Sequence, residues 1–150
     1  MSKPISELKQ AHKPNPAPIN ILDAFSTVKR FQGRTPEITD EEMQGASALL
    51  STYRDGGVYV TDYSGFSEWE QHPQGDEFVQ VMEGETHLVL WLDGRDQSHL
   101  LTSGQMMVVP QGVWHRFESP KGIKVMTITP QPSLHSISHP KHTDKLDGAR

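Results

Sequence analysis

Two stretches of this sequence decide its fold: WEQHPQGDEFVQVMEG at 69–84 and GQMMVVPQGVWHRFES at 104–119. In the first stretch, Glu70 and His72 are two residues apart, so in an extended strand their side chains project from the same face. The PQGD that follows reverses the chain, and Glu77 begins the next strand-like run. On spacing alone, these groups either converge on one point or are the exposed residues of an ordinary turn.

Turn signals recur regularly around these stretches. Through the middle of the chain, glycines are separated by eight to ten residues, and the segments between them are rich in Val, Ile, Thr and aromatic residues. The pair Asp93-Gly94 is typical of a two-residue hairpin turn. This rhythm predicts an all-β sandwich or barrel. Helix is scarce: residues 39–45 favour a short helix or single turn, and residues 19–31 are compatible with strand or helix.

Proline separates the ends of the chain from its middle. Four of the eleven prolines lie in the first twenty residues and three in the last twenty-one. Because proline lacks an amide hydrogen and restricts the residue before it, such stretches are poor helices and poor central strands. We expect a Pro-rich N-terminal arm at 1–20, a β-barrel domain at 21–130 and a polar C-terminal tail at 131–150.

The composition excludes several classes of function. The absence of cysteine excludes a disulfide framework, a thiol-ligated metal site and a thiol nucleophile. A formal charge of −5 without a basic cluster argues against nucleic acid and anionic membranes as partners. No apolar run approaches the roughly 18 residues of a membrane span, and the first ten residues lack the apolar core of a signal peptide. A soluble, cytoplasmic protein is expected.

The spacing within the two stretches resembles the two motifs of the cupin superfamily. In the first motif, the second residue of a His-x-His pair is followed by Glu after three or four residues and by Gly after six more. Here four residues separate His72 from Glu77, and six separate Glu77 from Gly84. The second motif runs Gly, five residues, Pro-x-Gly, two residues, His. The positions that match it are Gly104, Pro110, Gly112 and His115.

This resemblance implies a fold and a metal. The fold is the all-β double-stranded β-helix, a jelly-roll barrel, here with Pro-rich terminal arms. The metal is a divalent ion inside the barrel, and the family's ligands correspond by position to His72, Glu77 and His115. The fourth ligand position, a histidine in the family, is occupied by Glu70. A family member that has lost its metal, with a polar pocket in its place, is the alternative.

The sequence departs from the family pattern at Glu70, at Ser119 and in the spacing to Gly65. Ser119 stands in place of the Asn that closes the second motif, which concerns a turn, and four residues instead of five separate Gly65 from Glu70. Glu70 concerns the metal directly. A carboxylate oxygen is an ordinary ligand for zinc and is favoured by harder ions. Glu70 is therefore either a fourth ligand, a partner of His72 or of a bound water, or a general base beside a metal-bound substrate.

The resemblance does not choose a reaction, because this fold supports many chemistries. One hypothesis is a small enzyme that uses Fe²⁺, Mn²⁺, Ni²⁺ or Zn²⁺ to act on a small oxygen-rich organic molecule, as a dioxygenase or isomerase. The alternative is a non-enzymatic domain that binds a small molecule, with or without a structural metal, which the altered first ligand position favours.

Side chains outside the ligand set carry further predictions. By strand alternation, Val79 and Phe117 lie on the ligand-bearing faces and are expected to line the pocket, with Trp114 at its mouth. Outside the two motifs, the histidines of the terminal arms are expected to be solvated and without a role. They are His12, His135, His139 and His142.

The segment THLVLWL at 86–92 is apolar on both of its faces, whereas a half-buried strand shows a polar outer face. Val89 and Trp91 therefore need a cover, which is either the N-terminal arm or a second subunit. We expect a homodimer, because two-fold dimers are the commonest oligomers.

Overall fold

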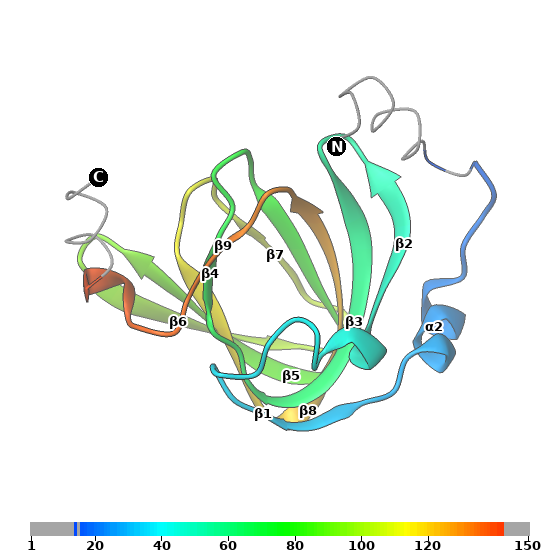
Figure 1. Ribbon diagram of the computed structural model, residues 1–150, viewed down its shortest axis with the longest axis horizontal. Helices are drawn as coiled ribbons and strands as arrows, with labels where there is room; N and C mark the ends of the chain where they lie inside the picture. Colours follow the sequence, from blue (N-terminus) through cyan, green and yellow to red (C-terminus); the bar gives the residue numbers. More distant parts are fainter. Residues whose placement is uncertain (1–13, 15, 143–150) are drawn as a thin grey trace.

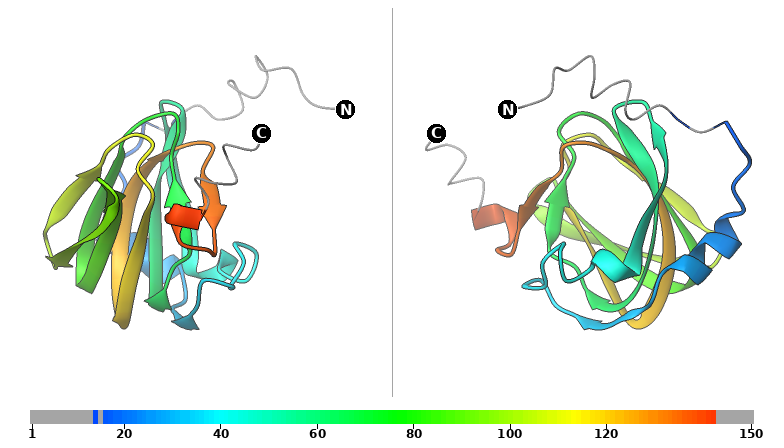
Figure 2. Two further views of the ribbon diagram at one scale, coloured as in Figure 1. Left: turned by 90° about the vertical axis from the view of Figure 1, so that its left-hand side faces the viewer. Right: turned by 45° about the vertical axis from the view of Figure 1, so that its right-hand side comes forward.

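The computed structural model describes residue 14 and residues 16–142. Within this part of the chain, nine strands form one strongly curled sheet that bends round into a barrel (Figure 1; Figure 2, right). The all-β prediction is confirmed. The strands are β1 (Phe31–Arg34), β2 (Ser47–Tyr53), β3 (Gly56–Phe66), β4 (Trp69–Gln71), β5 (Glu77–Leu92), β6 (Arg95–Thr102), β7 (Met106–Val109), β8 (His115–Pro130) and β9 (Leu134–Ser136).

Helices in the described residues are short. The segment 19–31, which the sequence left open, contains the helix α2 (Ile21–Ala24), the 3-10 turn η1 (Phe25–Thr27) and the first residue of β1. Asn20 caps α2, because its side chain accepts a hydrogen bond from the amide of Asp23 at 3.1 Å. A second 3-10 turn, η2 (Gln44–Ala46), precedes β2. No helix among the described residues is long and apolar enough to cross a membrane.

The single turn predicted after Thr39 is confirmed. The amide of Thr39 donates to Glu42 Oε2 at 2.8 Å, and the amide of Glu42 donates to Thr39 Oγ1 at 3.2 Å. This reciprocal pair is a capping box.

The two longest strands, β5 and β8, hold the barrel together. They pair antiparallel along most of their length, and β8 also pairs with β3 while β5 pairs with β6 and β7. Both strands change register near Gly84 and Gly122, which have φ angles of 84° and 98°. A Cβ on Gly84 would lie 2.3 Å from the Gly122 carbonyl oxygen, so only glycine allows the two strands to cross this closely.

The inward faces of the strands form the main core. Its members are buried apolar side chains from several strands together with residues before β2. They include Met43, Tyr63, Val79, Val81, Leu88, Leu90, Val109, Phe117, Ile123 and Val125. Ser119, where the motif resemblance fails, is fully buried and donates to the Thr86 hydroxyl at 2.7 Å.

The C-terminal segment packs on the barrel. Strand β9 pairs with β4 (Figure 1), and the His139 ring meets Trp69 and Trp91 edge-on, with centroid distances of 4.9 and 4.6 Å. Trp91, with Val89, belongs to an apolar cluster on the outer face of the sheet. The N-terminal arm or a second subunit was expected to cover this face, and in the described chain the C-terminal segment contacts it through His139.

The domain division at 20/21 and 130/131 stays a prediction. The described part of the C-terminal tail contains β9 and the His139 contacts, so its path depends on the barrel. The remainder of both arms, residues 1–13, 15 and 143–150, and with it His12, lies outside the described residues.

Candidate metal centre

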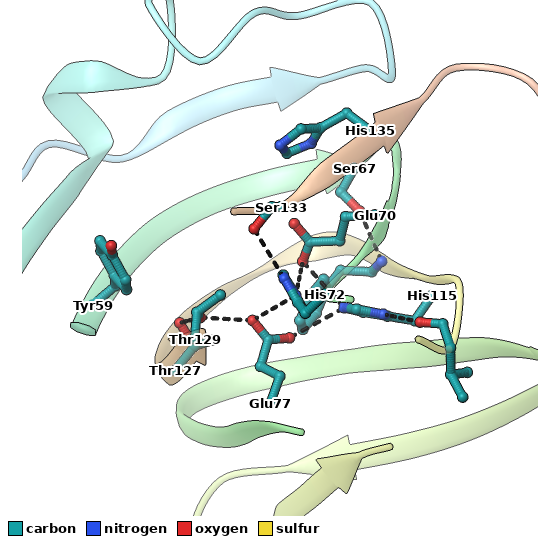
Figure 3. Close-up of polar contacts among 12 residues, drawn as sticks. Tyr59, Ser67, Glu70, His72, Glu77, His115, Thr127, Thr129, Ser133 and His135 are labelled. Atoms are coloured by element: carbon teal, nitrogen blue, oxygen red, sulfur yellow. Dashed lines mark hydrogen bonds and ion pairs between the residues drawn. The ribbon is translucent and has the colours of Figure 1, made fainter. Parts of the chain in front are cut away.

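Four ligand-type side chains meet inside the barrel (Figure 3). Glu70 lies in β4, His72 directly follows β4, and Glu77 and His115 are the first residues of β5 and β8. One ligand atom from each of the four lies within 4.8 Å of every other. Local strand alternation brings Glu70 and His72 together, while the long-range pairing of β4 with β8, in which Glu70 faces His115, adds the distant histidine.

The turns around the centre are joined by hydrogen bonds. The amide of Gly112, in the Pro-x-Gly turn, donates to the His72 carbonyl at 3.0 Å. The Gln111 side chain donates to the Pro73 carbonyl at 2.8 Å, and the Gln71 side chain donates to the Gly112 carbonyl at 2.8 Å. These bonds fix the two motif turns against each other, which sets the positions of the histidines that flank them.

The distances among the four groups are those of charged partners in contact. Glu77 has one oxygen 3.1 Å from His72 Nε2 and the other 3.1 Å from His115 Nε2. Glu70 Oε1 lies 3.2 Å from His115 Nε2 and 3.8 Å from His72 Nε2. His72, Glu77 and His115 are buried, whereas the Glu70 side chain keeps 23% of its exposure.

Each histidine directs Nε2 towards the centre and uses Nδ1 elsewhere. His115 Nδ1 donates to the Val113 carbonyl at 2.9 Å, which leaves the Nε2 lone pair directed inward in the neutral ring. His72 Nδ1 lies 2.9 Å from the Ser133 hydroxyl. His72 Nε2 is buried and makes no hydrogen bond of acceptable geometry in the described chain.

Hydrogen bonds also orient the carboxylate of Glu77. The Thr129 hydroxyl donates to Glu77 Oε2 at 2.7 Å, and the Thr127 hydroxyl lies 2.9 Å from that of Thr129. Such outer hydrogen bonds are typical of metal ligands, because they fix the ligand and raise its basicity. Two imidazoles and two carboxylates, held this way around one point, fit a divalent first-row ion.

Without a metal, the four groups perturb one another strongly. Burial lowers the pKa of His115, but the adjacent Glu70 and Glu77 outweigh it and raise the pKa to about 10. The same balance raises the pKa of His72 to about 9. Burial raises the pKa of Glu70, but the two imidazoles beside it hold that pKa well below its usual range. The pKa of Glu77 is lowered for the same reason, against burial and the charge of Glu70.

Two of the four groups, Glu70 and Glu77, border a cavity of about 620 Å³. Of the three residues predicted at the pocket, Phe117 lines this cavity. Val79 instead lies in the packed core, and Trp114 lies in the apolar cluster on the outer face. Strand alternation placed Val79 on the correct face but did not give its depth in the barrel.

Four residues of the C-terminal tail line the cavity, Gln131, Pro132, Ser133 and His135, although the histidines of this tail were expected to be solvated. Ser133 contacts His72, and His135 lines the cavity with Nδ1 2.9 Å from Glu68 Oε1. Hydrogen bonding to Glu68 raises the pKa of His135. No local pattern marks either residue, since both depend on the path of the chain after β8.

A family model described as the cupin domain, Cupin_2, matches residues 59–129 of the chain. The matched segment contains all four groups of the centre.

The chain is also similar to a curated bacterial protein and to a solved cupin-2 structure. The Bacillus subtilis protein YdbB, itself described as uncharacterized, is 31% identical over 75 residues, which cover 49% of this chain and 63% of YdbB. The chain spans less than two thirds of either curated relative that it matches. A cupin-2 domain protein from Shewanella frigidimarina is 27% identical, with a TM-score of 0.57 over 75% of this chain and 94% of that protein.

An enzyme shares the fold at lower identity. The hydroquinone 1,2-dioxygenase from Sphingomonas sp. TTNP3, solved with 4-hydroxybenzoate bound, is 15% identical. Its TM-score is 0.54, over 75% of this chain and 72% of that chain.

Proposed function

Because this chain belongs to the cupin superfamily, we propose that its barrel holds one divalent metal ion, with which it acts on a small oxygen-rich organic molecule. The ion would be Fe²⁺, Mn²⁺, Ni²⁺ or Zn²⁺, held by His72, Glu77 and His115. The reaction would be of the dioxygenase or isomerase type. A bound metal supplies a Lewis acid that polarises a substrate oxygen.

One observation carries this proposal: one atom from each of the four ligand-type side chains faces a common point, and three of the four side chains are buried there. Two carboxylates and two imidazoles directed at one buried point are a ligand set that suits a divalent ion. The outer bonds from Ser133 and Thr129 support the same conclusion, because they hold ligand atoms that already face one another.

Glu70 has two roles under this proposal. Its oxygen lies within the ligand group, so it can complete the coordination. It is also the most exposed of the four and borders the cavity, where a carboxylate of lowered pKa stays ionised and can accept a proton from a bound substrate.

A second candidate function is a non-enzymatic binding domain. It is favoured by the distances themselves, because each imidazole lies beside a carboxylate and the four groups largely satisfy one another without an ion. In that case the same cavity binds a small molecule and no reaction follows.

The compartment, the oligomeric state and the partners of the protein are proposals as well. We propose a cytoplasmic homodimer that binds neither nucleic acid nor membrane. The net charge of −5 supports the absence of nucleic acid. The exposed apolar side chains of β6 and β7, Leu100, Met106 and Val108, support a contact between subunits. Light scattering at micromolar concentration should give twice the mass of the chain, and a monomeric mass would contradict the dimer.

Elemental analysis of the full chain, purified without chelator, tests the metal. We expect close to one equivalent of a transition metal, and less than about a tenth of an equivalent, even after incubation with each candidate ion, would contradict the proposal. His115→Ala should remove most of the metal. His99→Ala is the matched control, because His99 is exposed on β6 and should leave the metal content unchanged.

Glu70→Gln separates the two roles of this residue. Loss of the metal would identify Glu70 as a ligand, whereas retention of the metal with loss of turnover would identify a base. Saturable binding of small molecules without turnover, in the metal-loaded protein, would favour the binding domain.

A further inference from the structure

A cationic side chain borders the same cavity as Glu70 and Glu77. Arg34, the last residue of β1, lines the cavity, and its guanidinium carbon lies 4.7 Å from the centre of the Tyr63 ring. Among the described residues, no carboxylate lies within ion-pair distance of Arg34. Its Nε is buried and has no hydrogen-bond partner in the described chain.

A second unpartnered donor lies beside Arg34. Tyr63 is 2% exposed, lines the cavity, and its hydroxyl makes no hydrogen bond of acceptable geometry with any described residue. Burial, against the opposing charge of Arg34, raises the pKa of Tyr63 to about 12, so the phenol keeps its proton and remains a donor. Two buried donors without acceptors at one cavity wall indicate an acceptor that binds there.

The fold places Arg34 at this wall through a close backbone contact. Strand β1 runs parallel to β3, with Arg34 opposite Gly65. A Cβ on Gly65 would lie 2.2 Å from the Arg34 carbonyl oxygen, so β1 can approach β3 only because residue 65 is glycine. Gly65 therefore leaves the room that the backbone of Arg34 needs to lie beside the cavity.

We propose that Arg34 and Tyr63 bind an anionic group of the substrate, a carboxylate, while an oxygen elsewhere in the same molecule reaches the metal. This inference rests on the proposed function and narrows its substrate class to small organic acids that carry an oxygen donor away from the carboxylate. A guanidinium is suited to this role, because its planar donors match the two oxygens of a carboxylate. The cavity of about 620 Å³ is of the size usual for small-molecule sites.

The carboxylates of the protein itself could compete for Arg34. Three of them line the cavity, namely Asp40, Glu70 and Glu77, and none makes an ion pair with Arg34. Asp40 is exposed in the turn before η2, and the other two face the histidines of the centre. The guanidinium is therefore left for a group that enters from outside.

A matched pair of probes tests the carboxylate site. The catechol oxygens of 3,4-dihydroxybenzoate bind divalent metals and its carboxylate lies across the ring, whereas 3,4-dihydroxybenzamide is neutral and of equal size. Zinc is the metal used, because it has no redox chemistry with catechols. In calorimetric titrations, the zinc-loaded protein should bind the acid about tenfold more tightly than the amide, or more.

Variants assign this preference to named residues. Arg34→Gln should abolish the preference for the acid, Tyr63→Phe should reduce it several-fold, and Arg34→Lys should retain part of it. Arg95→Gln is the matched control, because it removes the same charge from an exposed position on β6 and should leave the preference unchanged. Zinc content and unfolding midpoint are measured for every variant.

Three results overturn the inference: equal binding of the two probes by the wild-type protein, binding of neither, or an undiminished preference in Arg34→Gln. Failure of the proposed function is distinguishable, because it appears as a wild-type protein that takes up no zinc. The metal-free protein titrated with 3,4-dihydroxybenzoate then tests the anion site alone, and Arg34-dependent binding would still support it.

Discussion

The two imidazoles of the centre must change their protonation state when a metal binds. In the metal-free protein, the pKa values of about 9 for His72 and about 10 for His115 mean that both rings are protonated at pH 7. Only the neutral ring can coordinate a metal. The protons that the neighbouring carboxylates hold on these rings therefore compete with the ion, so the apparent metal affinity falls as the pH falls.

This competition gives a prediction about protons. Zinc uptake at pH 7 should release close to two protons per ion, one from each histidine, and the release should decline towards zero as the pH rises past about 10. Calorimetry in two buffers of different ionisation enthalpy measures the number. A release near zero at pH 7 would show that the histidines are already neutral.

The same pKa values make the stability of the metal-free protein fall as the pH rises, whereas the metal affinity rises. Both histidine pKa values are raised above the ordinary 6.5, so their pairing with Glu70 and Glu77 stabilises the metal-free protein fully below that pH. This contribution is lost as the pH rises through about 9 to 10. Alkaline pH thus favours metal binding while it weakens the metal-free fold.

At the scale of elements, the approach of β1 to β3 depends on one glycine. Gly65 has a φ of 119°, and its missing Cβ leaves room for the backbone of Arg34. Gly94, in the β5–β6 hairpin, also has a positive φ, of 74°, but a Cβ there would meet nothing within 4 Å. Substitution at Gly94 therefore introduces backbone strain alone, whereas substitution at Gly65 adds a steric clash with β1.

Alanine substitution at these two glycines should give unequal losses of stability. We expect Gly94→Ala to lower the free energy of unfolding by about 1 kcal/mol, from the left-handed conformation alone. Gly65→Ala should lower it by about 3 kcal/mol or more, because β1 must also move. Urea denaturation measures both values, and equal losses would contradict the close contact between the strands.

Among the elements, the strands and turns that depend on local periodicity could be predicted from the sequence. Alternation and the PQGD turn are local properties, and they allowed Glu70, His72 and Glu77 to converge without deciding that they do. The resemblance to the cupin motifs added His115, which meets the others through the long-range pairing of β4 with β8. In the sequence, the altered spacing between Gly65 and Glu70 looked like a minor departure. The structure gives Gly65 a role that the sequence does not show, because it contacts Arg34, about thirty residues earlier in the chain. Long-range approach of this kind has no local signature.

The path of the C-terminal segment was beyond prediction for a related reason. Ser133, His135 and His139 lie in a polar, Pro-containing stretch without periodicity, so nothing in it specifies which surface it follows. In the structure, its partners are supplied by the barrel, namely His72, Glu68 and the tryptophans of the outer face.

At the scale of the whole molecule, this segment connects the proposed metal centre with the outer face of the barrel. Ser133 contacts His72, a proposed ligand, on one side, and His139 packs on Trp69 and Trp91 on the other. Figure 2 shows the segment beside the barrel in two views. Its removal should therefore affect both the metal and the tryptophans.

A chain that ends at Pro130 tests this coupling. We expect its zinc affinity to fall about tenfold or more, because His72 loses an outer hydrogen bond. Its tryptophan emission should shift to longer wavelength, because Trp91 becomes exposed. A chain that ends at His142 is the control, since it keeps every contact described for the segment. Unchanged affinity and emission in the shorter chain would show that the segment contributes to neither.

The order of the strands along the chain has a consequence for biosynthesis. His115 opens β8, and Thr129, near its other end, bonds to Glu77. A polypeptide still emerging from the ribosome lacks both until β8 has left the exit tunnel and inserted between β3 and β5. The nascent chain therefore lacks part of this group of side chains, and an ion that needs all four can bind only after β8 has folded into the sheet.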